Sequence, residues 1–344
     1  MIREAIEQLV DGRSLGMEEA SGVMREVMDG EATQAQLSAF LVALRMKGET
    51  AEEMAGMAAV MREKAVRVEA DGLLVDTAGT GGDGKDTFNI STAASFVAAG
   101  AGVKIAKHGN RAASGSCGSA DVLEEMGVAI ELGPGAVKRC IEEVGIGFMF
   151  APAYHPAMRH AVPVRRELGI RTVFNFLGPL TCPAGAQNQL VGAPNPQIAE
   201  KMAQVLLLLG SRHSMVVHGE DGLDELTLGA DTLVWEVRDG DIRNYRVSPL
   251  DAGLGKAPTG QIQGGDRAVN ARILREVCQG RVGPVRDVVL LNTAAMLVVG
   301  DVVSSLAEGV DAARDAIDNG AALRCVDNLV ALSQSLAKGD ATNS

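Results

Sequence analysis

A glycine-rich loop between an apolar run and a run of small residues constrains the fold of this chain more than any other feature. Residues 76–83 read Asp-Thr-Ala-Gly-Thr-Gly-Gly-Asp; Leu-Leu-Val precedes them at 73–75, and a run of Ser, Thr, Ala, Phe and Val follows at 91–99. The first run predicts a buried strand and the second predicts the first turns of a helix. Glycines let the backbone approach an anion, and the N–H groups of a loop and of a helix start favour negative charge. The loop therefore predicts a phosphate site, although it matches neither common phosphate-loop motif and a purely structural turn stays the alternative.

A second predicted strand ends in the same way. Residues 103–106 are a strand candidate, and the polar segment 107–119 leads from them into a predicted helix at 120–126. Ligands of open α/β sheets bind outside the carboxyl ends of the strands, so this placement favours a binding role over solvated surface charges. The cations and hydroxyl donors of the segment are Lys107, Arg111, Ser114, Ser116 and Ser119.

A third cluster is acidic. The segment 219–226, Gly-Glu-Asp-Gly-Leu-Asp-Glu-Leu, follows a predicted strand at 215–218. Mg²⁺ prefers oxygen ligands and usually binds through one or two carboxylates together with substrate phosphates. Asp224 and Glu225 therefore suggest a magnesium site, with an acidic surface turn as an equal alternative. Asp83 fits the same picture if a metal ion or a sugar hydroxyl separates its carboxylate from a phosphate.

These clusters, taken in order, resemble the anthranilate phosphoribosyltransferase family. The segments 163–169, Pro-Val-Arg-Arg-Glu-Leu-Gly, and 174–180, Phe-Asn-Phe-Leu-Gly-Pro-Leu, carry the resemblance further along the chain. It implies transfer of a phosphoribosyl group from phosphoribosyl pyrophosphate to the amine of anthranilate, with release of pyrophosphate, in tryptophan biosynthesis. It also implies Mg²⁺ as cofactor and a homodimer formed through the N-terminal helices.

The resemblance implies a set of site residues as well. The donor would be bound by Gly79, Gly82, Asp83, Thr87, Asn89, Ile90, Ser91, Thr92, Lys107, His108, Gly109, Asn110, Arg111, Ala112, Ala113, Ser114, Gly115 and Ser119. Mg²⁺ would be held by Ser91, Asp224 and Glu225, and anthranilate by Gly79, Asn110 and Arg165. Gly115 departs from the family, whose loops often have a second serine there, but a backbone N–H can replace that hydroxyl.

The chemistry that the resemblance implies needs positioning and electrostatic stabilisation more than a nucleophile, because the ribose carbon becomes oxocarbenium-like. No residue is therefore expected to act covalently or as a clear acid or base. His108 is a candidate for orienting the aromatic ring or relaying a proton, and a structural role in its loop is as well supported. A guanidinium fits a carboxylate bidentately, which favours Arg165 as the anthranilate anchor. The alternative is that Arg165 and Arg166 are ordinary helix-surface charges.

The expected architecture is α/β. Residues 1–70 are expected to form a small helical domain, with a helical contribution from about 165–185, and 71–344 a larger α/β domain with a mainly parallel central sheet of the nucleoside phosphorylase/phosphoribosyltransferase type. Thr33–Gln36 and Thr50–Glu53 read as capping boxes of the first part. Its apolar stripes are Ile2, Ile6, Leu9 and Val10, and then Met54, Met57 and Met61. An Asp239–Gly240 turn predicts a β-hairpin, and the pattern from Gly265 onward is helical.

The composition limits the classes of binding partner that the chain can have. A net charge of −12 disfavours nucleic acid and anionic membranes, and 3 % aromatic residues disfavour a base-stacking surface. Five dispersed cysteines without a paired spacing indicate reduced thiols in the cytoplasm. The first residues lack the apolar core of a signal peptide, and no apolar run is long enough to span a bilayer. Two other functions stay open: a pyrimidine-nucleoside phosphorylase-like enzyme and a non-catalytic, nucleic-acid-binding homologue.

Overall fold

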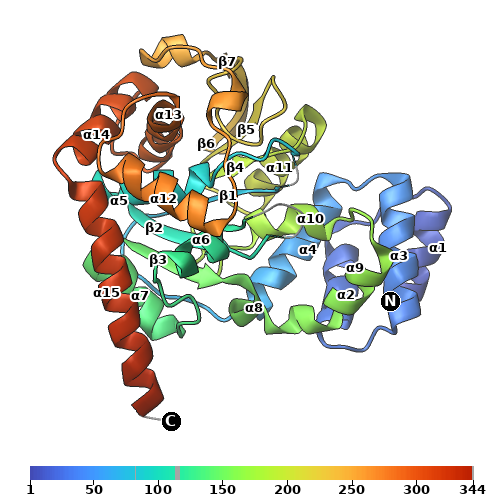
Figure 1. The fold of residues 1–344 in the computed structure, drawn as a ribbon. Coiled ribbons are helices and arrows are strands. Elements are labelled where there is room, and N and C mark those ends of the chain that lie inside the picture. Colours follow the sequence, from blue (N-terminus) through green and yellow to red (C-terminus); the bar gives the residue numbers. More distant parts are fainter. Residues whose placement is uncertain (82, 113–116, 343–344) are drawn as a thin grey trace.

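The chain folds into a helical part and an α/β part that pack side by side (Figure 1). The computed structural model describes residues 1–81, 83–112 and 117–342. Two apolar cores run through it, one centred on the N-terminal helices and one around the sheet. The N-terminal helices are α1 (Ile2–Val10), α2 (Met17–Met28), α3 (Gln34–Lys47) and α4 (Ala51–Lys64). Among the described helices, none has the length and apolar character that crossing a membrane requires.

Both predicted capping boxes of the helical part are confirmed. At the start of α4, the Thr50 hydroxyl accepts a hydrogen bond from the Glu53 N–H at 3.2 Å, and the Glu53 carboxylate accepts one from the Thr50 N–H at 2.8 Å. The Glu53 carboxylate is fully buried, and it also binds the Leu15 N–H and the Lys47 ammonium, both at 2.9 Å. The cap thus joins three segments of the helical part.

Thr50→Ala is expected to cost about 1 kcal/mol of unfolding free energy, because the Glu53 N–H at the start of α4 loses its acceptor. Urea unfolding followed by circular dichroism would show a lower midpoint. Glu52→Gln, which changes an exposed side chain in the same helical turn but removes no cap, should lower the midpoint less. Equal midpoints for Thr50→Ala and the unsubstituted protein would show that the cap contributes nothing.

The apolar stripes of the helical part are confirmed with one exception. Ile2 and Leu9 are buried, and so are all three methionines of α4. Val10 is 71 % exposed, so its assignment to the α1 stripe was wrong. Successive residues of a helix are about 100° apart, so Val10 at the end of α1 cannot share the face of Leu9.

A seven-stranded sheet forms the centre of the α/β part, with the strand order β3-β2-β1-β4-β5-β6-β7. Along the row β3-β2-β1-β4-β5, every strand is parallel to its neighbour, as predicted. The predicted hairpin of β6 and β7 extends this row with antiparallel pairing. Asp239 and Gly240 form the turn of that hairpin with φ values of +53° and +80°. The strands are β1 (Leu74–Gly79), β2 (Lys104–Gly109), β3 (Ile146–Phe150), β4 (Asn188–Gly192), β5 (His213–Gly219), β6 (Thr232–Arg238) and β7 (Asp241–Val247).

Two strands are longer than predicted. The predicted glycine loop begins at Asp76, whereas β1 continues to Gly79; Lys107 and His108 likewise lie within β2. Polar residues can extend these strands because β1 pairs with β2 and β4, and β2 with β1 and β3, on their two sides. Side chains that read as loop residues are therefore held rigidly at the carboxyl ends of the strands.

Helices surround the sheet and also connect it to the helical part. They are α5 (Ile90–Gly100), α6 (Ser119–Glu125), α7 (Pro134–Val144), α8 (Ala151–Tyr154), α9 (Val162–Leu168), α10 (Phe174–Leu177), α11 (Pro196–Leu208), α12 (Arg267–Cys278), α13 (Pro284–Val299), α14 (Leu306–Asp318) and α15 (Ala321–Thr342). Figure 1 shows α9 and α10 beside the N-terminal helices. Val164 of α9 and Phe174 and Leu177 of α10 belong to the same core as those helices. The segment between β3 and β4 therefore leaves the sheet, packs on the helical part and returns.

Candidate active site

The first and third sequence clusters meet at the carboxyl ends of β1 and β4. Gly79 and Gly192 are paired in register, and the segment after β5 lies against both. A Cβ added at Gly79 would lie 2.5 Å from Asp224 Oδ2, and one at Gly192 would lie 1.6 Å from the Asp224 carbonyl oxygen. Only glycine leaves room for this approach. The Gly81 N–H donates to Asp224 Oδ2 at 2.8 Å, which joins residues 143 positions apart.

Three carboxyl groups gather at this junction. Burial, the Asp83 charge and a contact with the Asp83 carboxyl raise the pKa of Asp224. Burial and the charges of Asp224 and Asp83 raise the pKa of Glu225, against the opposing effects of the Lys107 ammonium and the Ser91 N–H. Burial is the larger cause of both shifts, and the neighbouring negative charge adds to it, so a bound cation would be stabilising here.

The donor set at the junction suits a magnesium ion that shares its ligands with a substrate. Within the described residues, no group of three or more His, Cys, Asp or Glu side chains forms a cage for a metal ion. Asp224 and Glu225 carry carboxylate oxygens and Ser91 a hydroxyl, so these three residues would supply only part of an oxygen shell. Mg²⁺ is typically held in this way, with phosphate oxygens completing the shell.

Lys107 connects the second cluster to this junction. Its side chain is 2 % exposed, and its ammonium donates to the Thr77 carbonyl at 2.9 Å and to the Ser91 hydroxyl at 3.4 Å. Burial lowers the pKa of Lys107, whereas the carboxylates of Asp76 and Glu225 oppose that shift. The ammonium therefore lies between the end of β1 and the start of α5.

The turn that opens α5 carries the next predicted donor-binding residues. Thr87 forms an isolated antiparallel bridge with Gln263, and the Asn89 amide donates to the Cys117 carbonyl at 3.0 Å while its oxygen accepts from Asn270 at 3.0 Å. Ile90 begins the helix, and the buried Thr92 hydroxyl has no hydrogen-bond partner within the described residues. Asn89 therefore ties this helix start to the second loop.

The second loop, within residues 107–119, is fastened mainly by two acidic residues of α6. Arg111 forms a bidentate pair with Glu124 at 2.8 and 3.0 Å and also binds Asp121, which raises its pKa. Asp121 accepts from the Ala112 and Gly118 N–H groups at 3.0 and 2.8 Å. The guanidinium predicted to contact the donor is thus engaged within the protein. The sequence analysis assigned no role to Asp121 or Glu124, because their contacts with Arg111 and with the loop N–H groups depend on how the loop folds back on α6.

Gly109, Asn110 and Ser119 lie close together at the two ends of this loop. Gly109 ends β2, and its Cα lies against the Ser119 hydroxyl, so a Cβ there would be 2.2 Å from that oxygen. Ser119 donates to the Asn110 carbonyl at 3.3 Å, and the Asn110 side chain is exposed. Gly82, Ala113, Ser114 and Gly115 lie outside the described residues.

Arg165 is not an ordinary solvated charge. It projects from α9, its guanidinium carbon is 5.4 Å from the centre of the Phe174 ring, and burial lowers its pKa. No acidic side chain pairs with it within the described part of the chain. The neighbouring Arg166 is exposed. A partly desolvated cation without a carboxylate partner is a suitable anchor for an anionic ligand.

His108 is buried and uncharged. Burial, His155 and Lys107 lower its pKa to about 3, against the effect of the Gly178 carbonyl. Its ring centre is 5.0 Å from that of His155, whose pKa burial lowers to about 4. An imidazole whose pKa lies this far below 7 is a weak proton acceptor. Sequence reasoning did not single out His155, since no motif marked it.

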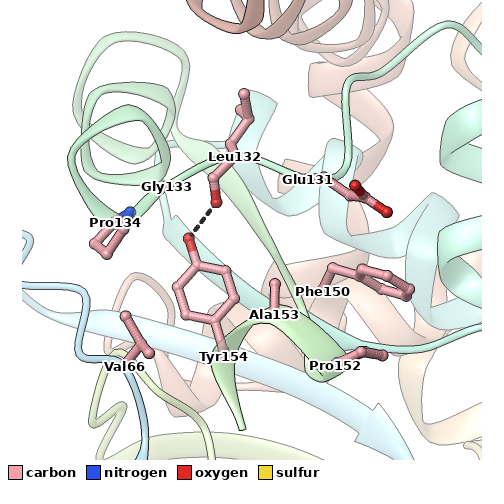
Figure 2. Close-up of a pocket in the computed structure, with 9 residues that line it drawn as sticks. All are labelled: Val66, Glu131, Leu132, Gly133, Pro134, Phe150, Pro152, Ala153 and Tyr154. Carbon is pink, nitrogen blue, oxygen red and sulfur yellow. Dashed lines mark hydrogen bonds between the residues drawn. The ribbon is translucent and has the colours of Figure 1, made fainter. Parts of the chain in front are cut away.

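Figure 2 shows a cavity of about 430 Å³ in the same part of the chain. It is mostly apolar, and the Tyr154 hydroxyl beside it donates to the Leu132 carbonyl at 2.8 Å. The lining residues are Val66, Glu131, Leu132, Gly133, Pro134, Phe150, Pro152, Ala153 and Tyr154. None of the predicted site residues lines this cavity, so the candidate site is the junction of strand ends and not this hollow.

Comparison with known proteins identifies two family models in the chain. The glycosyl transferase family helical bundle domain matches residues 3–65, and the glycosyl transferase family a/b domain matches residues 71–323. The chain is 53 % identical to an anthranilate phosphoribosyltransferase of Dehalococcoides mccartyi over 341 residues, which cover 98 % of this chain and 100 % of that protein.

Solved structures agree with these matches. An anthranilate phosphoribosyltransferase from Thermus thermophilus superimposes with a TM-score of 0.91 and 45 % identity, over 96 % of this chain and 99 % of that one. An anthranilate phosphoribosyltransferase from Saccharomyces cerevisiae in complex with PRPP and Mg superimposes with a TM-score of 0.89 and 28 % identity, over 97 % and 98 % of the two chains. Both domains are therefore shared with structures of one kind of enzyme.

Proposed function

The chain belongs to the anthranilate phosphoribosyltransferase family, and we propose that the junction at the ends of β1, β2, β4 and β5 is its donor site. The enzyme transfers the phosphoribosyl group of phosphoribosyl pyrophosphate to the amine of anthranilate. The products are N-(5-phosphoribosyl)anthranilate and pyrophosphate, in tryptophan biosynthesis. The observation that carries the site assignment is that two hydrogen-bonded pairs, Gly81–Asp224 and Lys107–Ser91, meet where the Lys107 charge interacts with Glu225.

The donor carries several negative charges, and the junction offers fixed groups for them. The N-terminus of α5 would face the donor with the Thr92 hydroxyl, which has no hydrogen-bond partner within the described residues, and the Lys107 ammonium is held close to this helix start. Groups that are already in place need no reorganisation when charge develops in the transition state. Gly109–Gly115 and Ser119 would contribute further donors from the second loop, largely through its backbone, since Arg111 is paired with Glu124.

We propose that Ser91, Asp224 and Glu225 hold Mg²⁺ together with the diphosphate of the donor. The crowded carboxyl groups, with their raised pKa values, support a cation at this place. Bound there, the ion would make pyrophosphate a better leaving group. The protein's own part is to orient the diphosphate through the Gly81–Asp224 contact and the Lys107 ammonium, so that the ribose carbon faces the acceptor.

The acceptor would be anchored by Arg165 and met by Gly79 and Asn110. Arg171, which follows α9, donates to the Gly81 carbonyl at 3.2 Å, and Arg45 of α3 donates to the Arg171 carbonyl. The segment that carries Arg165 is thereby joined to the glycine loop. The amine can then be presented to the ribose carbon without a nucleophile from the protein. Neutral His108 would orient groups by hydrogen bonding and not by carrying a proton.

One assay separates this function from its alternatives. Anthranilate and phosphoribosyl pyrophosphate with Mg²⁺ should give one pyrophosphate per anthranilate consumed. A pyrimidine-nucleoside phosphorylase-like enzyme would instead split a nucleoside with inorganic phosphate. A nucleic-acid-binding homologue would convert neither of these two pairs of substrates. Absence of pyrophosphate release from the first pair would refute the assignment.

We propose a cytoplasmic homodimer with its contact in residues 1 to about 60. Residues 1–70 with 165–185 would form the helical domain and 71–344 the α/β domain. A contact there would cover Val10 and Met46 of the helical part, which are 71 % and 83 % exposed. Light scattering at micromolar concentration should give twice the chain mass. A monomer at that concentration would contradict the proposal.

A further inference from the structure

Asp76 is a fully buried carboxylate to which the reaction described above assigns no role. It lies in β1, paired in register with Gln189 of β4, and its side chain is 0 % exposed. Burial raises its pKa to about 6, while the His108 N–H and the Lys107 ammonium oppose that rise. A buried charge stabilises a fold no better than a well-packed neutral group, so stability alone gives little reason for a carboxylate here.

Each oxygen of the carboxylate holds a different part of the site. Oδ1 accepts a hydrogen bond from the His108 N–H at 3.0 Å, and Oδ2 accepts one from the Gln189 amide at 3.4 Å. The same Gln189 nitrogen donates to the Pro179 carbonyl at 2.9 Å. The Asp76 side chain thus joins the end of β2, through Gln189, to the turn at 178–180.

The donor side of this link carries Lys107. Since the peptide between Lys107 and His108 is fixed by Asp76, the directions of both side chains are constrained. The Lys107 ammonium reaches the Thr77 carbonyl and the Ser91 hydroxyl, and His108 lies near the Gly178 carbonyl. A shift of this peptide would move the cation proposed to face the diphosphate.

The other side leads to the acceptor anchor. The turn at 178–180 directly follows α10, whose Phe174 lies beneath the Arg165 guanidinium. Arg62 of α4 donates to the Leu180 carbonyl at 2.7 Å and brings a cation whose charge interacts with Asp76. Asp76 is therefore connected to the donor strand, to the acceptor segment and to the helical part at once.

We propose that Asp76 is a positioning residue for the transfer reaction, which fixes the Lys107 strand end and the 178–180 turn relative to each other. This inference rests on the proposed roles of Lys107 and Arg165. A misplacement of about 1 Å between reacting groups costs roughly 100-fold in rate. Asp76 would contact neither substrate. It would affect the reaction through the relative placement of the residues that hold the two substrates.

The test compares Asp76→Asn with Ser333→Ala. Asn keeps the shape of the side chain and one oxygen for the His108 N–H, but it removes the charge beside Lys107 and places an NH2 group opposite the Gln189 amide that donates to Oδ2. Ser333 is also fully buried and accepts from the Ala129 N–H at 3.1 Å, but it lies in α15 outside the network. Asp76→Asn is expected to lower kcat about 10- to 100-fold, and Ser333→Ala to leave kcat within about twofold. Thermal melts would show comparable losses of stability for both. A kcat for Asp76→Asn as high as that of Ser333→Ala would overturn the proposal.

A double-mutant cycle supplies a readout that a structural role would not move. If Asp76 acts through Lys107, Asp76→Asn should also raise the donor KM, and that rise should largely disappear in a Lys107→Met background. Additive effects of the two substitutions would overturn the proposal.

Gln189→Met is the variant to use if Asp76→Asn does not fold, because it removes the hydrogen bond to the Pro179 carbonyl and leaves the carboxylate in place. An unchanged kcat in that variant would also overturn the proposal. Absence of turnover in the unsubstituted enzyme would refute the proposed function itself, which distinguishes the two failures.

Discussion

Asp224→Asn combined with Glu225→Gln is expected to abolish turnover, with kcat falling by at least about 10³-fold. The two carboxylates are the oxygen ligands proposed for the ion that shares the donor diphosphate. Amides of the same shape bind Mg²⁺ weakly, so the leaving group would lose its neutralising charge. Steady-state assays at saturating anthranilate and up to millimolar Mg²⁺ would measure the loss.

The protein with this double substitution should still fold. The amide that replaces the Asp224 carboxylate keeps an oxygen for the Gly81 N–H, and removing negative charge relieves the crowding that raises the pKa values of both carboxyl groups. Unfolding midpoints should therefore be unchanged or higher. Glu142→Gln with Glu143→Gln removes the same charge from adjacent acids of α7, which pair with Lys138 and Arg139, and should leave kcat unchanged. Near-normal, Mg²⁺-dependent turnover in the Asp224/Glu225 variant would contradict the metal role.

Arg165→Ala is expected to raise the KM for anthranilate about 10- to 150-fold, while the donor KM changes little. Loss of one charge-assisted bidentate contact costs about 1.5–3 kcal/mol, which corresponds to that range. The structure strengthens this expectation, because the guanidinium lies against Phe174 and pairs with no acidic side chain of the described chain. A carboxylate ligand would therefore gain a contact without displacing one.

Arg166→Ala is the matched control for Arg165→Ala. The two residues are adjacent in α9, but Arg166 is exposed, so its removal should leave both KM values within about twofold. Some loss of kcat is expected for Arg165→Ala alone, since a loosely held anthranilate points its amine less well at the ribose carbon. The assignment fails if the anthranilate KM stays unchanged, or if only the donor KM rises.

The sequence predicted the order of elements well because the signals were local. The Gly79–Asp83 loop, the two capping boxes and the Asp239–Gly240 hairpin each depend on a few neighbouring residues, and the alternation of strands and helices made a parallel sheet the simplest arrangement. The domain types and the family were predicted correctly, as the family models and solved relatives confirm. The same local reasoning placed the strand ends too early, because Asp76 and Lys107 are polar residues buried in central strands.

What local patterns could not reveal was the pairing between distant segments. The Gly81–Asp224 contact depends on the register of β1 with β4, and the pairing of Arg111 with Glu124 depends on how the second loop folds back on α6. The neutral state of His108 follows from burial against His155, which no motif marks. These features determine which residues face the substrates, so the roles of individual site residues stay predictions.

Calorimetric titration of phosphoribosyl pyrophosphate with Mg²⁺ into two variants tests the proposed division of the site most directly. Arg165→Ala should bind the donor with the affinity of the unsubstituted enzyme, because its defect is confined to anthranilate. Asp224→Asn with Glu225→Gln should lose the Mg²⁺-dependent part of donor binding. Equal, Mg²⁺-dependent donor affinity in the double variant, or a donor defect in Arg165→Ala, would contradict the account.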